Sequence, residues 1–468
     1  MTDAAQPSPR TAEGSMWESV ARPGEPVAGI FHGRAASVAL AELATGSTLG
    51  GKLEQLRGRS VVLATREQLP TAVALVELDG VARRLVLCTP DVAPDQIGGV
   101  CAAAEADAVL VDDAGAPQLP SSIFQIKLAP RPLRENLQRR RTETTDWILL
   151  TSGTTGAPKL VVHSFESLAG ALPRANLGKP MVWSTFYDIR RYGGLQIYLR
   201  AVISGSPLVL SSAGESTHDF LTRAGAAGVT HISGTPSHWR RALMSGETAL
   251  ISPEYVRLSG EVADQTVLDN LRSAYPNARI AHAFASTEAG VAFDVNDGLA
   301  GFPAEFVDNP RGAIEMKVQD GTLWIRSRRT AARYLGAAAA LAGTEGYVDT
   351  GDMVELAQGR YYFRGRKGGI INVGGLKVYP EEIESVLNAD PRVRMSRVLA
   401  RRNPITGALV VAEVVLADTQ GGEPSGAETV KNDLLNACRR ALAAHKVPAL
   451  LRFVPTLELT AAGKLVRP

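Results

Sequence analysis

The sequence predicts an α/β protein with a large N-terminal domain of α/β subdomains and a smaller α+β domain at the C-terminus. Two observations lead to this fold class. Short apolar runs alternate with amphipathic segments over most of the chain, which is typical of a parallel sheet covered by helices. Beyond residue 366 this alternation is replaced by a shorter stretch with strands and a helix of its own, which indicates a second domain.

The composition indicates a globular protein with small-molecule partners. A chain of 468 residues with 45% hydrophobic content is long enough for at least two domains. The 50 Lys and Arg residues nearly balance the 48 Asp and Glu residues, which argues against binding to nucleic acid or a membrane surface. No apolar run is long enough for membrane insertion, and the three cysteines are widely separated, so we expect a cytoplasmic protein.

The first half of the large domain contains a regular alternation. The polar, Pro-rich start of the chain predicts a flexible tail over residues 1–30, and the large domain is expected over 31–366. Within it we expect strands at 60–65, 84–89 and 107–113 and helices at 69–82 and 93–106.

The later strands each end in small or polar residues. They are expected at 147–152, 207–212, 229–236, 255–261 and 278–286, with a further strand at 321–327. Because ligands of open α/β sheets bind outside the carboxyl ends of the strands, we expect these polar clusters to face one crevice. The small domain is expected over 367–468, with strands at 397–402 and 408–417 and a helix at 428–445.

The stretch "LLTSGTTGAPKLVVHS", which begins at Leu149, combines hydroxyls, glycines and a lysine directly after an apolar strand. Glycine allows backbone N–H groups to approach a polyanion closely, and the hydroxyls and ammonium add further donors. The spacing is not that of a Walker A motif. By itself the stretch therefore leaves two interpretations open, a phosphate-binding loop and an ordinary strand-to-helix turn.

Six segments together carry a family resemblance. They are "LLTSGTTGAPKLVVHS", "AFASTEAG", "GTLWIRSRRTAARYLG", "GYVDTGDMVEL", "FRGRKGGIINVGGLKVYPEEIE" and "HKVPALLRFVPTLELTAAGKLVRP". In order and spacing they resemble the adenylate-forming superfamily of acyl-CoA synthetases, peptide-synthetase adenylation domains and luciferases, and most of all the 4-coumarate and aryl-CoA ligases. The resemblance extends from about Trp147 to the C-terminus.

This resemblance implies binding of ATP by matched residues in five segments. Those for the phosphates are Thr151, Ser152, Gly153, Thr154, Thr155, Gly156 and Lys159; those for the adenine are Ser259, Gly260, Glu261, Phe284, Ala285 and Ser286; those for the ribose are Asp352 and Arg366. The family more often has Tyr-Gly where this chain has Phe284-Ala285, so an aromatic face is retained and a hydroxyl is lost.

The resemblance also implies the catalytic residues. Lys464 matches the lysine that bridges carboxylate and α-phosphate oxygens, Thr287 a phosphate-contacting hydroxyl, and Glu288 the ligand of Mg²⁺. The family rotates a mobile small domain about a hinge, which here corresponds to Lys367 and Gly368. The "NVGGLKV" loop that follows would line a thiol tunnel or form a plain hairpin turn.

The predicted acid pocket departs from the family pattern. Its residues are Tyr187, Asp188, Gly193 and His231, and Tyr187 stands near the position where the family has a histidine. The nearby charges disfavour a fatty-acid tunnel, whereas the aromatic residues suit a flat aryl acid. His231 and His238 are expected to border this pocket or to be structural.

These matches lead us to expect an AMP-forming acid–thiol ligase. It would adenylate a small, aromatic carboxylic acid with ATP and Mg²⁺ and transfer it to CoA or to the thiol of a carrier protein. One alternative is adenylation of a non-carboxylic oxyacid such as nitrous acid, for diazotisation of an aromatic amine. The other is an inactive nucleotide-binding module, which would have no need of Lys464.

Overall fold

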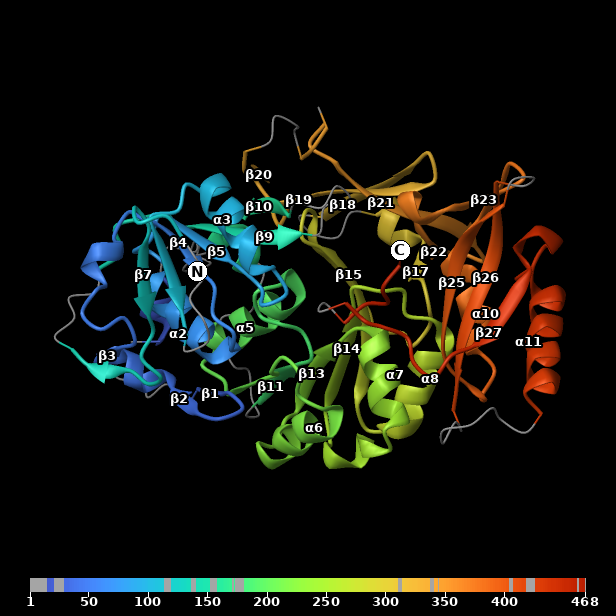
Figure 1. Ribbon diagram of the computed structural model, residues 1–468, viewed down its shortest axis with the longest axis horizontal. Coiled ribbons are helices and arrows are strands. Elements are labelled where there is room, and N and C mark those ends of the chain that lie inside the picture. The colour runs from blue at the N-terminus through green and yellow to red at the C-terminus, as the bar shows by residue number, and fades with distance from the viewer. Residues whose placement is uncertain are drawn as a thin grey trace, which may run out of the picture. The chain divides into compact units, whose positions relative to one another are not determined.

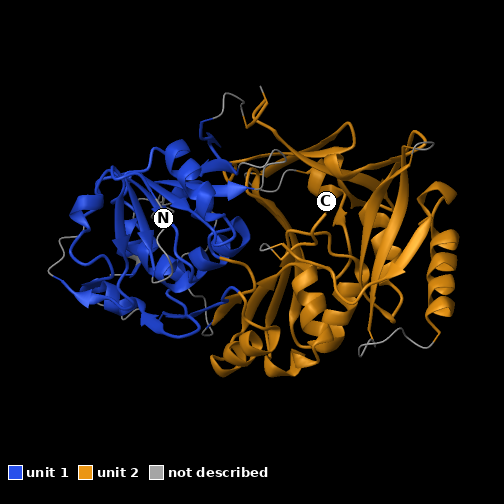
Figure 2. Ribbon diagram, in the orientation of Figure 1, with its two compact units in different colours: residues 1–181, 189–213, 331–339 blue, residues 182–188, 214–330, 340–468 orange. Residues whose placement is uncertain are grey.

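The computed structural model describes residues 15–20, 29–112, 119–135, 140–151, 158–170, 172, 181–309, 314–336, 341–343, 345–403, 407–417, 426–460 and 463–467. The chain forms two compact units, which Figure 2 shows in blue and orange. Unit 1 comprises residues 1–181, 189–213 and 331–339, and unit 2 comprises residues 182–188, 214–330 and 340–468. Each unit is described by itself below.

Unit 1 is built on a seven-stranded sheet in the order β20-β10-β9-β5-β4-β6-β7. The strands are β4 (Ser60–Leu63), β5 (Arg84–Leu87), β6 (Ala108–Val111), β7 (Phe124–Lys127), β9 (Asp146–Thr151), β10 (Lys159–His163) and β20 (Arg333–Tyr334). The neighbours from β9 to β7 run parallel, and β10 and β20 continue the sheet antiparallel. The central strands β4 and β6 are buried throughout, as expected where helices cover both faces of a sheet.

The remaining elements of unit 1 include the two helices predicted between its first strands. The helices are α1 (Met16–Val20), α2 (Gln68–Leu78), α3 (Pro94–Ala103), α4 (Phe165–Ala169) and α5 (Tyr192–Ser204), with the 3-10 turns η1 (Leu40–Ala44) and η2 (Glu54–Leu56). The strands β1 (Ile30–His32), β2 (Ser37–Ala39) and β12 (Leu208–Leu210) pair side by side, as do β3 (Gly46–Ser47) and β8 (Leu133–Arg134).

Helix α1 corrects the prediction of a flexible tail over residues 1–30. Met16 is fully buried, its backbone N–H donates to Asp79 Oδ2 at 2.8 Å, and the indole of Trp17 donates to the Leu43 carbonyl at 3.3 Å. Met16 and Trp17 are thus held by groups far along the chain. The polar residues around them in the sequence give no sign of these contacts.

Unit 2 contains a set of parallel strands in the order β15-β14-β13-β11, and β16 adds antiparallel to β15. The strands are β11 (Trp183–Thr185), β13 (His231–Gly234), β14 (Tyr255–Ser259), β15 (Arg279–Ser286) and β16 (Gly290–Val295). The helical elements are α6 (Thr217–Ala226), α7 (Pro236–Met244), η3 (Glu247–Leu250) and α8 (Gln265–Ala274). Helix α7 packs against β13 and α8 against β15 (Figure 1).

A second sheet of unit 2 is antiparallel and encloses an aromatic core. Its order is β17-β22-β21-β19-β18, from β17 (Phe302–Pro303), β18 (Ile314–Gln319), β19 (Thr322–Ser327), β21 (Val348–Ala357) and β22 (Arg360–Arg366). Together with α9 (Glu305–Asp308) it buries Phe302 and Phe306.

The C-terminal part of unit 2 has its own apolar core, around Ile383, Leu387, Val414 and Leu434. It contains η4 (Lys367–Gly369), β23 (Ile371–Val373), β24 (Leu376–Val378), α10 (Pro380–Asn388), β25 (Val393–Asn403), β26 (Gly407–Leu416), α11 (Ala427–Ala441), η5 (Ala444–Lys446) and β27 (Leu450–Phe453). The separate core is compatible with a small domain over 367–468, and that boundary stays a prediction.

None of the helices among the described residues is long and apolar enough to cross a membrane.

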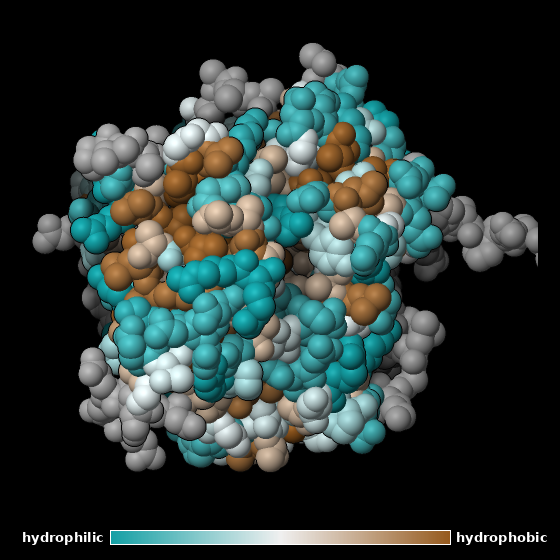
Figure 3. Space-filling view, turned by 90° about the vertical axis from the view of Figure 1, so that its right-hand side faces the viewer, coloured by the Kyte–Doolittle hydropathy of each residue, from teal (hydrophilic) through white to brown (hydrophobic). Residues whose placement is uncertain are grey.

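On the face drawn in Figure 3, apolar side chains gather in patches separated by hydrophilic ones. Cys88, Cys101 and Cys438 are all buried as free thiols.

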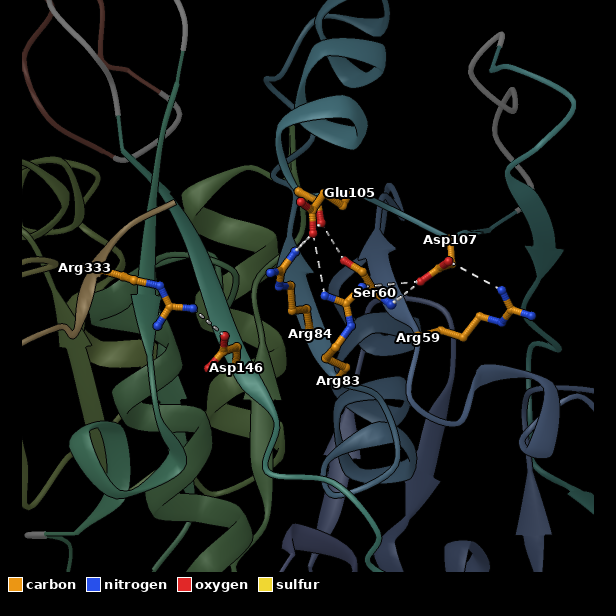
Figure 4. A network of polar contacts seen from close by, with 9 residues as sticks. Arg59, Ser60, Arg83, Arg84, Glu105, Asp107, Asp146 and Arg333 are labelled. Atoms are coloured by element: carbon orange, nitrogen blue, oxygen red, sulfur yellow. Dashed lines mark hydrogen bonds and ion pairs between the residues drawn. The ribbon is translucent and has the colours of Figure 1, made fainter. Parts of the chain in front are cut away.

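A network of charged side chains lies at the amino ends of β4, β5 and β6 in unit 1 (Figure 4). Arg84 Nη1 donates to Glu105 Oε2 at 2.8 Å, and Arg83 approaches the same carboxylate at 3.7 Å. Asp107 faces Arg59 at 3.4 Å and Arg83 at 3.8 Å. Two carboxylates thus pair with three guanidinium groups next to neighbouring strands.

Candidate active site

The carboxyl ends of the parallel strands in unit 2 meet at one edge, as the sequence predicts. Strands β11, β13, β14 and β15 are paired in register and end at Thr185, Gly234, Ser259 and Ser286. The hydroxyl of Tyr187, which follows β11, donates to the Ser259 carbonyl at 2.7 Å. Polar residues from separate segments are therefore brought together at this edge.

Gly260 lies directly after β14 and is covered by the side chain of Lys464. Its φ of +86° is in the left-handed region that favours glycine. A Cβ atom at this position would lie 3.4 Å from Lys464 Cε and 3.9 Å from Nζ. The predicted adenine-binding loop and the predicted catalytic lysine are thus in contact, although 204 positions separate them in sequence.

Asp352 and Arg366 face one another on the adjacent strands β21 and β22. Arg366 Nε donates to Asp352 Oδ1 at 3.3 Å, and the carboxylate side chain is only 16% exposed. Burial raises the pKa of Asp352, while Arg366 and Lys464 draw it down. The ammonium of Lys464 therefore acts electrostatically on the predicted ribose-binding carboxylate.

The segment around Phe284 follows the same edge. Phe284 is half-buried and stacks on Phe363, with ring centroids 5.1 Å apart and planes at 9°. A β-bulge separates it from Ala285, and Ser286 Oγ accepts the Ala289 N–H at 2.9 Å. This hydrogen bond braces the turn over 287–289.

Thr287 and Glu288 form that turn, and both are half-buried. Within the described residues no group of three or more His, Cys, Asp and Glu side chains gathers to hold a metal ion. A metal bound here would accordingly depend on ligands from a bound nucleotide as well as on Glu288.

The predicted phosphate loop belongs to unit 1. Thr151 ends β9 and Lys159 begins β10, directly opposite one another in the antiparallel pair. The ammonium of Lys159 lies over the ring of Tyr334 at 5.4 Å. Ser152, Gly153, Thr154, Thr155 and Gly156 lie outside the described residues.

His231 corrects the predicted pocket. It is the first residue of β13, so it lies at the amino end of the strand, opposite the polar edge. Its ring packs between Trp183 and Tyr255, at centroid distances of 4.7 and 5.6 Å, and its Nδ1 bonds the Thr230 hydroxyl. Its surroundings are those of a structural histidine.

The other predicted pocket residues have different surroundings. Tyr187 is buried and engaged with Ser259, and burial raises the pKa of its hydroxyl. Asp188 is half-buried in unit 2, and Gly193 is half-buried in the first turn of α5 in unit 1. The pocket role of these three residues stays a prediction.

The arginines that follow the predicted pocket residues are paired with other groups of the protein. Arg190 is buried and donates to the Thr65 carbonyl, and Arg191 pairs with Asp91 at 2.7 Å. Both contacts lie within unit 1. The positive charges that set this segment apart in the sequence are thus used in folding contacts.

The predicted hinge and thiol loop lie next to each other. Lys367 and Gly368 are exposed in η4, between β22 and β23. Gly374 and Gly375, with φ of +59° and +86°, form the turn of the β23–β24 hairpin. The hairpin itself is observed, and both the thiol-tunnel role of this loop and the hinge role stay predictions.

His238, which the sequence predicts to border the acid pocket or to be structural, and Thr235, which the sequence does not assign to the site, lie at the start of α7. The Thr235 hydroxyl accepts the His238 N–H at 3.0 Å and caps the helix. The His238 ring stacks on Phe186 at 5.3 Å, and burial lowers its pKa to about 4, so the ring is neutral at pH 7. The sequence "GTPSH" carries a helix-start signal, but its contacts with residues near 463 depend on the fold.

Comparisons with known proteins agree with this architecture. The model of the AMP-binding enzyme family matches residues 64–335, and that of the AMP-binding enzyme C-terminal domain matches residues 382–464. The 2-succinylbenzoate–CoA ligase of Listeria monocytogenes serovar 1/2a is 27% identical in an alignment of 387 residues, and the match covers 78% of this chain and 78% of the relative.

Two solved structures share the fold. The anthranilate CoA ligase AuaEII in complex with anthranoyl-AMP has a TM-score of 0.80 at 18% identity and covers 97% of this chain and 95% of its own. An E. coli MenE variant with bound OSB-AMS has a TM-score of 0.76 at 21% identity, over 96% and 97% of the two chains. The predicted superfamily, fold class and enzymatic nature are confirmed. Since the first family model covers more than half of the sequence, the chain belongs to the AMP-binding enzyme family.

Proposed function

We propose that the protein adenylates a small aromatic carboxylic acid with ATP and transfers the acyl group to the thiol of CoA. The observation that carries this proposal is the position of Lys464, over Gly260 at the carboxyl edge of β14 and within electrostatic reach of Asp352. A nucleotide-binding site alone has no need of a lysine at that point. The similar 2-succinylbenzoate–CoA and anthranilate CoA ligases, by their names, act on aromatic acids, which favours this substrate class.

In the first step a carboxylate oxygen of the acid attacks the α-phosphorus of ATP. A new P–O bond forms, the bond to the β-phosphate oxygen breaks, and pyrophosphate leaves with the electron pair. Negative charge on the transferring phosphate increases on the way, and the Lys464 ammonium would stabilise it. Thr287 would donate a hydrogen bond to the same phosphate.

The residues at the edge suit the rest of the nucleotide. The Asp352 carboxylate can accept hydrogen bonds from both ribose hydroxyls, with Arg366 beside it. The segment of Gly260, directly after β14, would lie beside the adenine, as the family resemblance implies. Lys159 and the loop 151–156 would bind the outer phosphates.

Mg²⁺ is part of the proposal. Glu288 would supply one hard carboxylate oxygen, and the phosphates of ATP would supply others, which is a ligand set that Mg²⁺ favours. When bound, the ion neutralises charge on the phosphates.

In the second step a thiolate attacks the acyl carbon of the adenylate. A C–S bond forms, the C–O bond to the phosphate breaks, and AMP leaves. We propose CoA as the acceptor because the similar ligases are named for CoA, and a carrier-protein thiol is the next candidate. The small domain would rotate between the two steps, and the family resemblance assigns the hinge of this rotation to Lys367 and Gly368.

The two other functions considered from sequence are less well supported. Nitrite adenylation was suggested in part by the charges after Tyr187, but Arg190 and Arg191 are engaged in contacts within unit 1. An inactive module does not account for the position of Lys464. We also propose a cytoplasmic location, in keeping with three buried free thiols.

The test is AMP release from ATP and Mg²⁺ in two parallel sets of reactions. One set offers 2-succinylbenzoate, anthranilate and benzoate with CoA, and the other offers nitrite with aromatic amines. We expect AMP and a CoA thioester in the first set only. AMP that requires nitrite would overturn the proposal in favour of diazotisation, and failure with every acid would contradict the aromatic substrate class.

A further inference from the structure

The carboxylate of Glu261 joins two segments that are far apart in the sequence. Its Oε2 accepts the Ser237 N–H at 2.9 Å, in the first turn of α7, and its Oε1 accepts the Leu465 N–H at 3.2 Å, near the C-terminus. Both oxygens are thus used by backbone donors within unit 2. The sequence predicts Glu261 for the adenine wall, whereas this carboxylate is turned to the protein itself.

A second contact joins the same two segments. The Thr235 hydroxyl, which caps α7, donates to the Gly463 carbonyl at 2.7 Å and is fully buried. Gly463 has a φ of +69°, and a Cβ atom there would lie 1.8 Å from His238 Cε1. The C-terminal segment therefore fits against the start of α7 only with a glycine at this position.

These contacts flank Lys464 on both sides. Gly463 and Leu465 are held by Thr235 and Glu261, and the Lys464 N–H itself donates to Thr460 Oγ1 at 3.2 Å. A backbone fixed on both sides of one residue restricts the direction of its side chain. Here that direction brings Lys464 Cε over Gly260.

The far end of the segment is tied to the C-terminal part of unit 2 instead. The Val466 carbonyl accepts from Arg397 at 2.8 Å, and Arg467 pairs with Glu384 at 2.8 Å. The contacts of Thr235 and Glu261 are consequently the ones that join the lysine segment to the strand edge.

We propose that Glu261 and Thr235 form a latch that positions Lys464 for the first step. Both are positioning residues, since their contacts are with backbone groups on either side of the lysine. This inference rests on the proposed function for the identity of that step. The latch has no role in attack by the thiol, because that step has no P–O bond formation for Lys464 to assist.

Glu261→Gln tests the latch without large disruption. The amide keeps one acceptor oxygen but presents an NH₂ group to the second N–H donor, so one of the two contacts is lost. The matched control is Glu428→Gln on α11, where the side chain is 75% exposed. Thermal unfolding of each variant is measured alongside, to confirm that it folds.

The first readout needs no substrate. Hydrogen–deuterium exchange of the free, full-length protein reports on the Leu465 amide, which donates to Glu261. We expect exchange of the peptide over 459–467 to rise about tenfold in Glu261→Gln and to stay unchanged in Glu428→Gln. Unchanged exchange in Glu261→Gln would overturn the latch, whether or not the enzyme turns over the acids offered.

The second readout separates the two steps. With the best acid of the aryl series, we expect Glu261→Gln to slow ATP–pyrophosphate exchange about tenfold, while thioester formation from synthetic acyl adenylate and CoA changes less than about twofold. Gly463→Ala places a Cβ atom against His238 and so obstructs the contact of the C-terminal segment with α7. This variant should likewise slow pyrophosphate exchange and leave thioester formation nearly unchanged. Equal slowing of both steps in these folded variants would overturn the positioning role.

Discussion

The candidate site in unit 2 and the charged network in unit 1 use similar side chains in opposite ways. In the network, Glu105 is 71% exposed and meets two guanidinium groups, so its charge is balanced in open solvent. In the site, Asp352 is only 16% exposed, and its pKa is raised by burial in spite of Arg366 and Lys464. Water screens the first arrangement more than the second, in which Asp352 is largely buried although Arg366 is 66% exposed. The difference indicates that the charges of the network act in folding alone. The charges of Asp352, Arg366 and Lys464 can still act strongly on a bound ligand.

Replacement of Lys464 by alanine should have the largest effect. We expect the rate of ATP–pyrophosphate exchange to fall by about 100- to 1000-fold, because a positioned charge on the transferring phosphate is lost. ATP affinity, measured by calorimetry, should change less than about threefold. Lys431→Ala on α11 is the matched control and should leave both quantities unchanged. Equal losses of rate and affinity would make Lys464 a binding residue and break the comparison.

Replacement of Asp352 by asparagine should act on ATP binding. An amide accepts fewer hydrogen bonds than a carboxylate, so we expect the Kd for ATP to rise about tenfold. The raised pKa of Asp352 adds a pH dependence, because the group protonates at a higher pH than an ordinary aspartate. ATP binding of the wild type should weaken as the pH falls through that pKa, and titration calorimetry should find this component missing in Asp352→Asn. A Kd for ATP that is the same in the variant and the wild type would contradict the ribose assignment.

Much of the fold could be predicted from the sequence, because the strands of both units are short apolar runs with clear ends. The segments 60–63, 84–87, 255–259 and 279–286 all form strands where the pattern predicts them. The anchoring of α1 could not be predicted, since Met16 bonds a carboxylate 63 positions away.

The candidate site likewise contains features that the sequence predicts and features that it does not. The polar edge followed from strand order, and Asp352, Arg366 and Lys464 followed from the family resemblance. For His231 the sequence leaves a pocket role and a structural role open, and its contacts at the amino end of β13 support the structural one. The latch was missed because Glu261 and Leu465 are 204 positions apart and meet through a backbone N–H, which has no sequence signature.

The ion pair at the far end of the lysine segment tests whether burial of the carboxylate explains the difference between the network and the site. Glu384 is 8% exposed, pairs with Arg467 at 2.8 Å, and has its pKa raised by burial from 4.5 to about 7. The folded state then binds more protons than the unfolded state between these two values, so stability should fall as the pH rises through that range. We expect the free energy of unfolding to drop by about 3 kcal/mol over the whole range and Glu384→Gln to flatten this dependence. Denaturant unfolding at a series of pH values measures it, and a stability that rises over the same range would contradict the sign.

The charged network should show the smallest effect. Its pairs are exposed, and removal of one carboxylate by Glu105→Gln should lower the free energy of unfolding less than any of the changes above, because water already screens the attraction. The difference from wild type should shrink further at high salt, and the rate of adenylation should be unchanged within about twofold. Denaturant unfolding at low and high ionic strength, with pyrophosphate exchange on the same samples, provides the measurement. A loss of activity at constant stability would mean that the network also acts on the site, and charge balance in solvent would then no longer distinguish the two regions.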